Sequence, residues 1–215
     1  MNYETLEAQA RARHLSIFGA FHPEPEDNVP HDARTLLLLG PHEPGFWAHV
    51  TAEPEFTDDE PDPLDRWSRR VIGRWACNLG AKALFPFGRP PYHPFFTWAL
   101  RSGRAWASPV QLLVHDTAGL FVSYRGAIAL QERISLPPPG RKPCDTCVER
   151  PCEAACPVTA LTPEGYDIPA CKSFVQGEGT DCRETGCAVR RACPVSAQYG
   201  RQSAQSAFHM RAFLG

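Results

Sequence analysis

The sequence predicts an α+β fold in two parts, a helix-and-strand module over residues 1–136 followed by a cysteine-rich module over residues 137–215. Three observations lead to this prediction. Apolar runs of strand type alternate with amphipathic helix patterns through the first part. A stiff proline-rich segment, PPPGRKP, then follows at residues 137–143. Eight of the nine cysteines come after that segment.

The first module begins with a predicted helix, YETLEAQARARHL, followed by a short strand, LSIFGAF. The segment RTLLLLGP (34–41) is a continuous apolar run that ends at Gly-Pro, which is typical of a buried central strand. The Pro-rich stretch 53–63 carries many acidic residues and predicts a loop.

The segment PLDRWSRRVIGRWACNLG (63–80) predicts an amphipathic helix. Its large apolar residues recur at every third or fourth position: Leu64, Trp67, Val71 and Trp75. Cys77 lies alone on this helix, and we expect it to be a small buried apolar residue rather than a ligand.

The remainder of the first module is predicted to contain four further elements. AKALFPFG is a short strand, RPPYHP is a rigid turn, and FFTWALRSG is a short helix that ends at Gly103. The segment 108–130 contains two strand-like runs separated by the turn residues 115–119, a pattern that predicts a β-hairpin.

Charge is distributed unevenly along the chain. Residues 1–65 carry 3 basic and 14 acidic side chains, residues 66–143 carry 12 and 2, and residues 144–215 carry 7 and 8. We expect the acidic and basic segments to neutralise each other within the fold. The alternative is that the basic middle segment binds an anionic ligand or a nucleic acid.

No signal-peptide pattern begins the sequence, and no apolar run approaches the ~18 residues that would cross a bilayer. The expected location is therefore cytoplasmic, without membrane contact. Thiols stay reduced in that compartment, so nine cysteines indicate metal binding rather than disulfides.

The eight clustered cysteines form two runs, and each run ends in a Cys-Pro step. The first run is Cys144, Cys147, Cys152 and Cys156, and after it come Cys171, Cys182, Cys187 and Cys193. Eight thiolates are the ligand count of two [4Fe–4S] clusters, and in the ferredoxin pattern the cysteine of the Cys-Pro step binds the other cluster. The spacing therefore predicts that Cys144, Cys147, Cys152 and Cys193 bind one cluster, and Cys156, Cys171, Cys182 and Cys187 the other.

Three alternatives stay open at this point: a single cluster, zinc, or free thiols. Structural zinc sites usually contain paired C-x2-C knuckles, and this sequence has one such pair. Gaps of four and five residues between cysteines exceed the usual ferredoxin spacing, so the assignments of Cys171 and Cys182 are the least fixed.

The cysteine pattern resembles the C-terminal half of epoxyqueuosine reductases, which are corrinoid iron–sulfur enzymes. ACKSFVQ (170–176) stands where that family has a segment between its two cysteine runs. Upstream, residues 99–130 are similar to the family's A-x-R-A-G-L-G-W-x-G-K segment and its following strands, with Arg101, Gly103 and Trp106 at matching positions. The stretch PPYHPFFTW (90–98) is also similar to the I-H-P-R-F-G-G-W stretch of B12-processing chaperones of the same fold, with His93 as the matching histidine.

The resemblance implies a nitroreductase-like first module that holds cobalamin beside a two-cluster ferredoxin-like module. The candidate corrinoid contacts are Tyr92, His93, Ser123, Tyr124 and Arg125, and no catalytic residue is assigned. Two departures argue against epoxyqueuosine reduction itself. FGRPPYHP has no carboxylate where the family has a proton-donating Asp, and the family's lysine is missing from the stretch Trp106–Pro109.

These patterns together predict an iron–sulfur electron-transfer protein. It would accept electrons from a redox partner protein or another low-potential donor and, as an oxidoreductase, pass them to a corrinoid in the first module. The alternatives are a simple ferredoxin-like carrier without a corrinoid and an RNA-associated iron–sulfur protein. Nucleic acid is not the expected partner.

Overall fold

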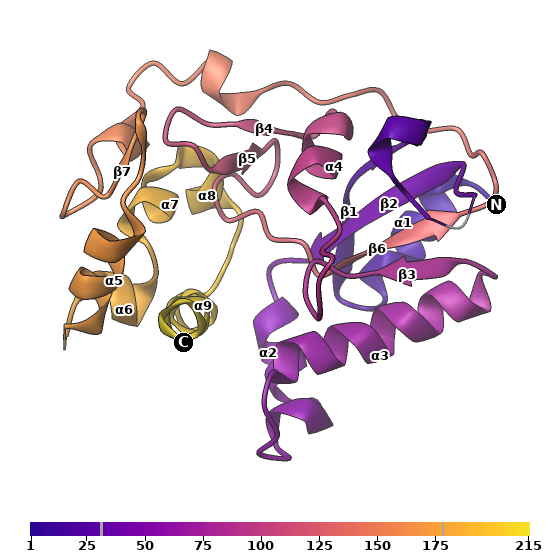
Figure 1. The fold of residues 1–215 in the computed structure, drawn as a ribbon, viewed down its shortest axis with the longest axis horizontal. Coiled ribbons are helices and arrows are strands. Elements are labelled where there is room, and N and C mark those ends of the chain that lie inside the picture. The colour runs from indigo at the N-terminus through magenta and orange to yellow at the C-terminus, as the bar shows by residue number, and fades with distance from the viewer. Residues whose placement is uncertain (31, 178) are drawn as a thin grey trace. The chain divides into compact units, whose positions relative to one another are not determined.

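The computed structural model describes residues 1–30, 32–177 and 179–215, and it has the predicted α+β composition (Figure 1). The chain divides into two compact units. Residues 1–104 and 123–140 form the first, here called the sheet unit, and residues 105–122 and 141–215 form the second, here called the cysteine unit. The sequence placed the boundary between modules after residue 136 and assigned residues 105–122 to the first module.

The sheet unit contains a four-stranded antiparallel sheet in the order β1-β2-β6-β3. These strands are β1 (Leu15–Phe21), β2 (Thr35–Pro41), β6 (Gly126–Leu130) and β3 (Lys82–Leu84). Every residue of β2 is buried, and β2 pairs on both sides, Leu37 lying opposite Ala20 and Ile128. The prediction of a buried central strand is confirmed.

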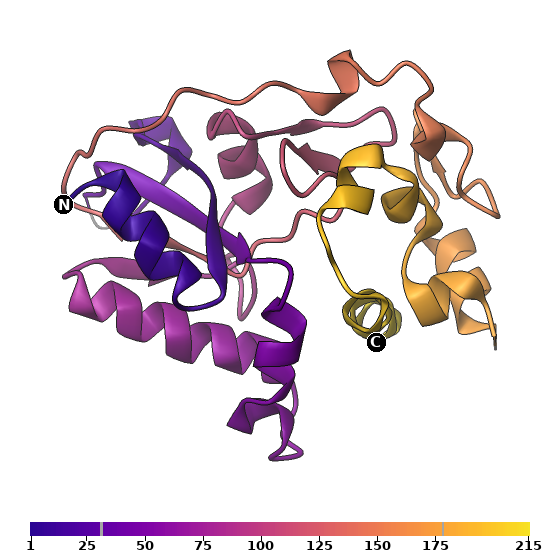
Figure 2. The ribbon, with the colours of Figure 1, turned by 180° about the vertical axis from the view of Figure 1, so that it is seen from behind.

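Two helices lie side by side along this sheet, α1 (Tyr3–Arg11) and α3 (Pro63–Asn78) (Figure 2). The indole Nε1 of Trp75 donates a hydrogen bond of 2.8 Å to Gln9 Oε1 and joins them. α3 buries Leu64, Trp67 and Trp75 as predicted, with Ile72 also buried and Val71 only half-buried. Cys77 is exposed, so its predicted burial was wrong: the buried stripe runs through Ile72, Trp75 and Ala76, and Cys77 projects beyond it.

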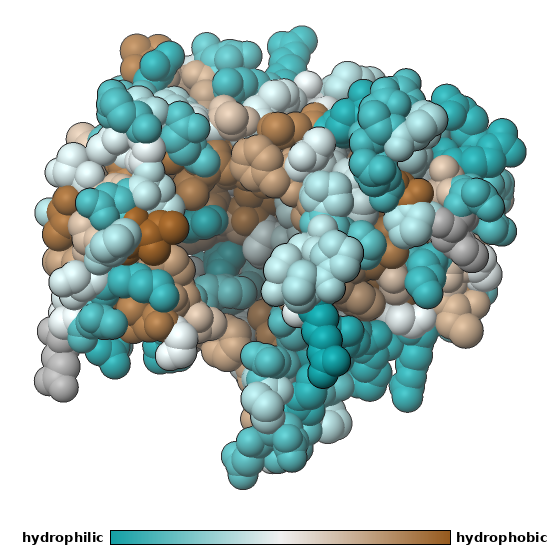
Figure 3. Space-filling model, in the orientation of Figure 1, coloured by the Kyte–Doolittle hydropathy of each residue, from teal (hydrophilic) through white to brown (hydrophobic). Residues whose placement is uncertain are grey.

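Shorter helices complete the sheet unit. They are η1 (Pro25–Asp27), α2 (Phe46–Thr51), η2 (Pro54–Phe56) and α4 (Phe95–Arg101). The acidic connection between α2 and α3 forms a hydrophilic projection (Figure 3).

Acidic and basic segments neutralise each other in part within the sheet unit. Arg70 binds Glu55 and Glu53, each at 2.5 Å, and Arg66 binds Asp58 at 2.7 Å. Other arginines of the basic segment likewise bind acids from the first 65 residues: Arg101 with Glu24 and Asp27, and Arg125 with Asp65. The hydrogen bond from Arg70 holds the pKa of Glu55 below its ordinary value. These pairs involve four of the twelve basic side chains of residues 66–143.

The cysteine unit contains two small antiparallel pairs and a series of short helices. The pairs are β4 (Ala105–Ala107) with β5 (Leu113–His115), and β7 (Leu161–Thr162) with β8 (Gly165–Tyr166). The helices are η3 (Pro143–Asp145), η4 (Pro151–Glu153), α5 (Ile168–Gln176), α6 (Asp181–Thr185), α7 (Ala188–Ala192), α8 (Pro194–Gln198) and α9 (Ser203–Leu214). Within the described residues, no helix is both long and apolar enough to cross a membrane.

The predicted hairpin over residues 108–130 was wrong. β5 pairs with β4 and β6 pairs with β2 and β3, so the two runs belong to different sheets. Hydrogen bonds to α8 and to the connection between α8 and α9 explain the difference. The Leu120 amide donates to Ser196 Oγ at 2.8 Å, and Arg201 Nη1 donates to the Phe121 carbonyl at 3.1 Å. These bonds hold residues 105–122 in the cysteine unit.

Candidate metal centre

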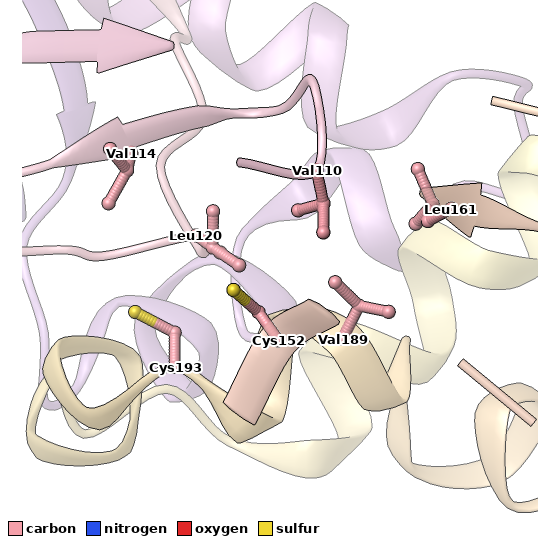
Figure 4. Packing of buried hydrophobic residues seen from close by; sticks show 7 residues of the cluster. All are labelled: Val110, Val114, Leu120, Cys152, Leu161, Val189 and Cys193. Carbon is pink, nitrogen blue, oxygen red and sulfur yellow. The ribbon is translucent and has the colours of Figure 1, made fainter. Parts of the chain in front are cut away.

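An apolar core surrounds two of the predicted ligands in the cysteine unit. Cys152 and Cys193 are each 8% exposed, and they pack among Val110, Val114, Leu120, Leu161 and Val189. Figure 4 shows both sulfur atoms pointing to the same side, toward Val114 and Leu120. Because β5 and its flanking loops supply Val110, Val114 and Leu120, the segment that was assigned to the first module forms a wall of this site.

Four cysteines line one cavity of about 560 Å³: Cys144, Cys147, Cys152 and Cys193. We call them the first thiol set. Cys144 and Cys152 lie in the 3₁₀ turns η3 and η4, and Cys193 caps the start of α8 with Pro194 at the first helical position. Burial raises the pKa of the Cys152 thiol, and the nearby Cys144, Cys193 and Cys147 raise it further. Burial also raises the pKa of Cys144, against the opposing charge of Lys142.

The other four cysteines line a second cavity of only about 20 Å³: Cys156, Cys171, Cys182 and Cys187. We call them the second thiol set. Helix α5 carries Cys171, α6 carries Cys182, and Cys187 caps the start of α7. Burial raises the pKa of Cys171, a hydrogen bond from Tyr166 lowers it, and the neighbouring Cys187 and Cys156 raise it. These are the same two groups of four that the Cys-Pro spacing assigned, while metal binding by them stays a prediction.

Hydrogen bonds reach three of the four sulfur atoms in the second set. The Ala160 amide donates to Cys156 Sγ at 3.1 Å, the Ala188 amide donates to Cys182, and the Tyr166 hydroxyl donates to Cys171. Burial and the contact with Cys171 raise the pKa of Tyr166 well above its ordinary value, so the hydroxyl keeps its proton. Donors aimed at sulfur stabilise thiolates and the anionic clusters that thiolates hold.

Arg190 is a cation beside the second thiol set. Its Nη1 donates a hydrogen bond of 2.6 Å to the Leu120 carbonyl, and it forms no ion pair with a carboxylate among the described residues. Burial lowers the pKa of Arg190, whereas the proximity of Cys187 and Tyr166 raises it. A desolvated cation without a carboxylate partner is costly unless another anion lies close. Thiolates of the second set would supply that anion.

Sequence reasoning missed both Tyr166 and Arg190. A signal existed for Arg190, since a charged residue between Cys187 and Cys193 stands inside a run of expected ligands. Tyr166 lies five residues before Cys171, and no spacing rule connects a tyrosine at that distance to a thiol.

The donor set suits an iron–sulfur cluster, and the two cavities fit it differently. In the part of the chain that the structure describes, no group of three or more His, Cys, Asp or Glu is arranged to hold a single metal ion. A four-iron cluster needs thiolates spaced farther apart, because each thiolate binds a different iron. The first cavity has a volume of about 560 Å³, whereas the second has space for about one water, so side chains of the second set must move to admit a cluster.

The candidate corrinoid contacts do not all line the groove that contains Tyr92 and His93. Rings connect two of them: His93 stacks on Trp98 at 5.4 Å between centroids, Trp98 contacts Phe95 at 5.1 Å, and Phe95 contacts Tyr124 at 6.3 Å. Tyr92 is 63% exposed and lines a groove with His93 that does not include residues 123–125.

Arg125 and Ser123 have different surroundings from Tyr92. Arg125 is buried, donates to Ser68 Oγ at 3.0 Å and to Asp65, and lies 5.1 Å from the centre of the Phe87 ring. The hydrogen bonds of Arg125 thus go to other residues of the sheet unit. The Ser123 hydroxyl is buried and makes no hydrogen bond with a described residue.

Comparisons with known proteins add little to this geometry. No protein-family model matches the sequence, and no curated protein matches it. Among solved structures, the chain is similar to a crystal structure of selenomethionine-labelled epoxyqueuosine reductase, with 16% identity and a TM-score of 0.44. The similarity covers 96% of this chain and 62% of that one, so this chain spans less than two thirds of that protein. Function is therefore inferred from the two thiol sets.

Proposed function

We propose that this chain is an iron–sulfur electron-transfer protein that holds two [4Fe–4S] clusters, one on each thiol set. One observation carries the proposal: eight cysteines from two distant runs line two cavities, four to each. In both cases the cysteine of the Cys-Pro step, Cys156 or Cys193, lies with the cysteines of the other run. That exchange is what a pair of cubanes held by pseudo-symmetric runs requires.

The surroundings of the thiols support the same function. A four-iron cluster bound by thiolates carries one electron at a time at low potential, and its net charge is negative. Lys142 beside Cys144 and Arg190 beside Cys187 place positive charge next to both sets. Val114 and Leu120 exclude water from one side of the first set. A low-potential redox protein as the electron donor is part of this proposal.

A corrinoid acceptor in the sheet unit is a second candidate. The half-buried imidazole of His93, which stacks on the buried Trp98, favours it, because histidine is a common metal ligand and a corrinoid carries a cobalt ion. Titration of the full chain with cobalamin tests it. We expect a shift of the visible spectrum that is lost in His93→Ala, and an unchanged cobalamin spectrum would remove this candidate while leaving the cluster proposal intact.

The cluster proposal is tested by anaerobic reconstitution of the full chain with iron and sulfide, followed by metal analysis and EPR. We expect about eight irons and about eight sulfides per chain, with two reducible paramagnetic centres. Cys77→Ala is the matched control, because Cys77 is exposed on α3 in the sheet unit and should bind no iron. Zinc without iron, or four irons per chain, would overturn the assignment.

A further inference from the structure

The sheet unit contains a basic groove of about 250 Å³ that the electron-transfer function does not use. Three cations line it: Arg69 on α3, Lys82 on β3 and Arg89 in the Pro-rich turn before α4. No carboxylate lines the groove among the residues that the structure describes. A groove with three cations and no acid attracts anions.

Arg69 differs from Arg66 and Arg70, its neighbours on α3. Arg66 and Arg70 each bind carboxylates, whereas the side chains of Arg69, Lys82 and Arg89 make no hydrogen bond or ion pair with any described residue. The acidic first segment therefore neutralises the neighbours of the groove and leaves the groove itself positive.

Arg69 is held in place by aromatic rings. Its guanidinium carbon lies 5.5 Å from the centre of Phe85 and 5.2 Å from that of Phe87. Gly88 permits this position, since its φ is +122° and an added Cβ would lie 2.8 Å from Arg69 Nη2. Rings that contact the guanidinium face leave its N–H edge free to donate, and that edge matches two oxygens of a phosphate.

Two aromatic side chains lie beside these cations. Tyr92 is 63% exposed and His93 is half-buried, and both line the groove. An exposed tyrosine ring is a stacking surface for a planar ligand. Phosphate recognition and ring recognition are thus present in one groove.

We propose that the basic groove binds a nucleoside monophosphate. Arg69 binds the phosphate oxygens bidentately, Lys82 and Arg89 add positive charge, and Tyr92 stacks on the base. The site lies wholly in the sheet unit, so it does not depend on cluster binding and extends beyond the proposed electron transfer.

Calorimetric titration of the full chain with adenosine 5′-monophosphate, adenosine and inorganic phosphate tests the proposal. We expect the monophosphate to bind more tightly than either part alone.

Arg69→Gln should weaken binding of the monophosphate about tenfold or more, the effect of losing a charge-assisted pair of hydrogen bonds. The matched control is Arg74→Gln, an exposed arginine on the same helix and outside the groove, which should change the affinity less than about twofold. Tyr92→Ala should weaken binding of the monophosphate and leave that of inorganic phosphate unchanged.

Three results would overturn the proposal. The first is monophosphate binding no tighter than phosphate binding, which would mean that the ring is not recognised. The second is an equal effect of Arg69→Gln and Arg74→Gln, with circular dichroism showing that both variants fold. The third is binding of cobalamin, but not of the monophosphate, that depends on Arg69, which would assign the groove to a corrinoid.

Discussion

Each thiol set contains four cysteine thiols, and the two sets lie in different surroundings. Turns and loops carry the first set along a cavity of about 560 Å³, whereas the starts and bodies of helices carry most of the second set around about 20 Å³. Hydrogen bonds reach three sulfurs of the second set, and Arg190 lies beside it. Arg141, Lys142 and Arg150 line the first cavity, and Lys142 lies near Cys144.

This difference indicates that different structural features position the thiols of the two proposed cluster sites. Helical positions are fixed by backbone hydrogen bonds, so the second set is organised by secondary structure and by donors to sulfur. The first set depends on an apolar wall from residues 108–122 and on a cavity that is open to the surroundings. We therefore expect the two clusters to respond differently to the same change.

The largest expected effect is the loss of one cluster at a time. Cys193→Ala should remove the first cluster and Cys171→Ala the second, because each removes a ligand that comes from outside the run Cys144–Cys152. After reconstitution, iron should fall from about eight to about four per chain in each variant, and the two should retain different EPR signals. If both variants lost the same signal, or either kept all its iron, the assignment of thiols to separate sets would fail.

A smaller effect is expected from a chelator. The first cavity is far larger than the second, so iron in the first set is more accessible to an added chelator. We expect the first cluster to lose iron several-fold faster under anaerobic conditions, measured as the rate at which its EPR signal decays. The signal is assigned by comparison with Cys193→Ala. Equal rates would show that the difference in cavity volume does not govern access.

The elements that local patterns determine were predictable from the sequence. The spacing of Leu64, Trp67 and Trp75 identifies α3, and the uninterrupted apolar run identifies β2. The two runs within 108–130 could not be assigned correctly in this way. Their partners are set by contacts with Ser196 and Arg201, about 80 residues later, which no local pattern records.

The candidate site divides in the same way. The grouping of the cysteines could be predicted from the two Cys-Pro steps. In the ferredoxin pattern, the cysteine of such a step binds the other cluster. The wall that Val114 and Leu120 provide, and the approach of Arg190 to Cys187, arise only when distant segments pack together. Burial of Cys77 was wrongly predicted because hydrophobic character alone does not specify which side of a helix a residue occupies.

Substitution of Arg190 by Gln tests whether the cation beside the second thiol set affects the potential of the cluster there. Loss of a positive charge beside Cys187 destabilises the reduced cluster, which carries one more negative charge, so the midpoint potential of the second cluster should fall. We expect a shift on the order of tens of millivolts in an EPR-monitored redox titration, with the first cluster unchanged. Arg183→Gln is the control: this arginine of α6 donates to the Gln176 carbonyl and should leave both potentials in place.

The smallest effect is expected for Tyr166→Phe, which removes one hydroxyl donor and little volume. The hydroxyl donates to Cys171, and a donor to a ligand sulfur stabilises the more negative, reduced state. The second cluster should therefore keep its iron, and its potential should fall by less than in Arg190→Gln. Tyr199→Phe is a matched control, because Tyr199 follows α8 and lines neither thiol cavity. An unchanged potential in Tyr166→Phe would mean that the hydrogen bond to Cys171 does not affect the second cluster. The small volume of the second cavity would then be what distinguishes the second thiol set from the first.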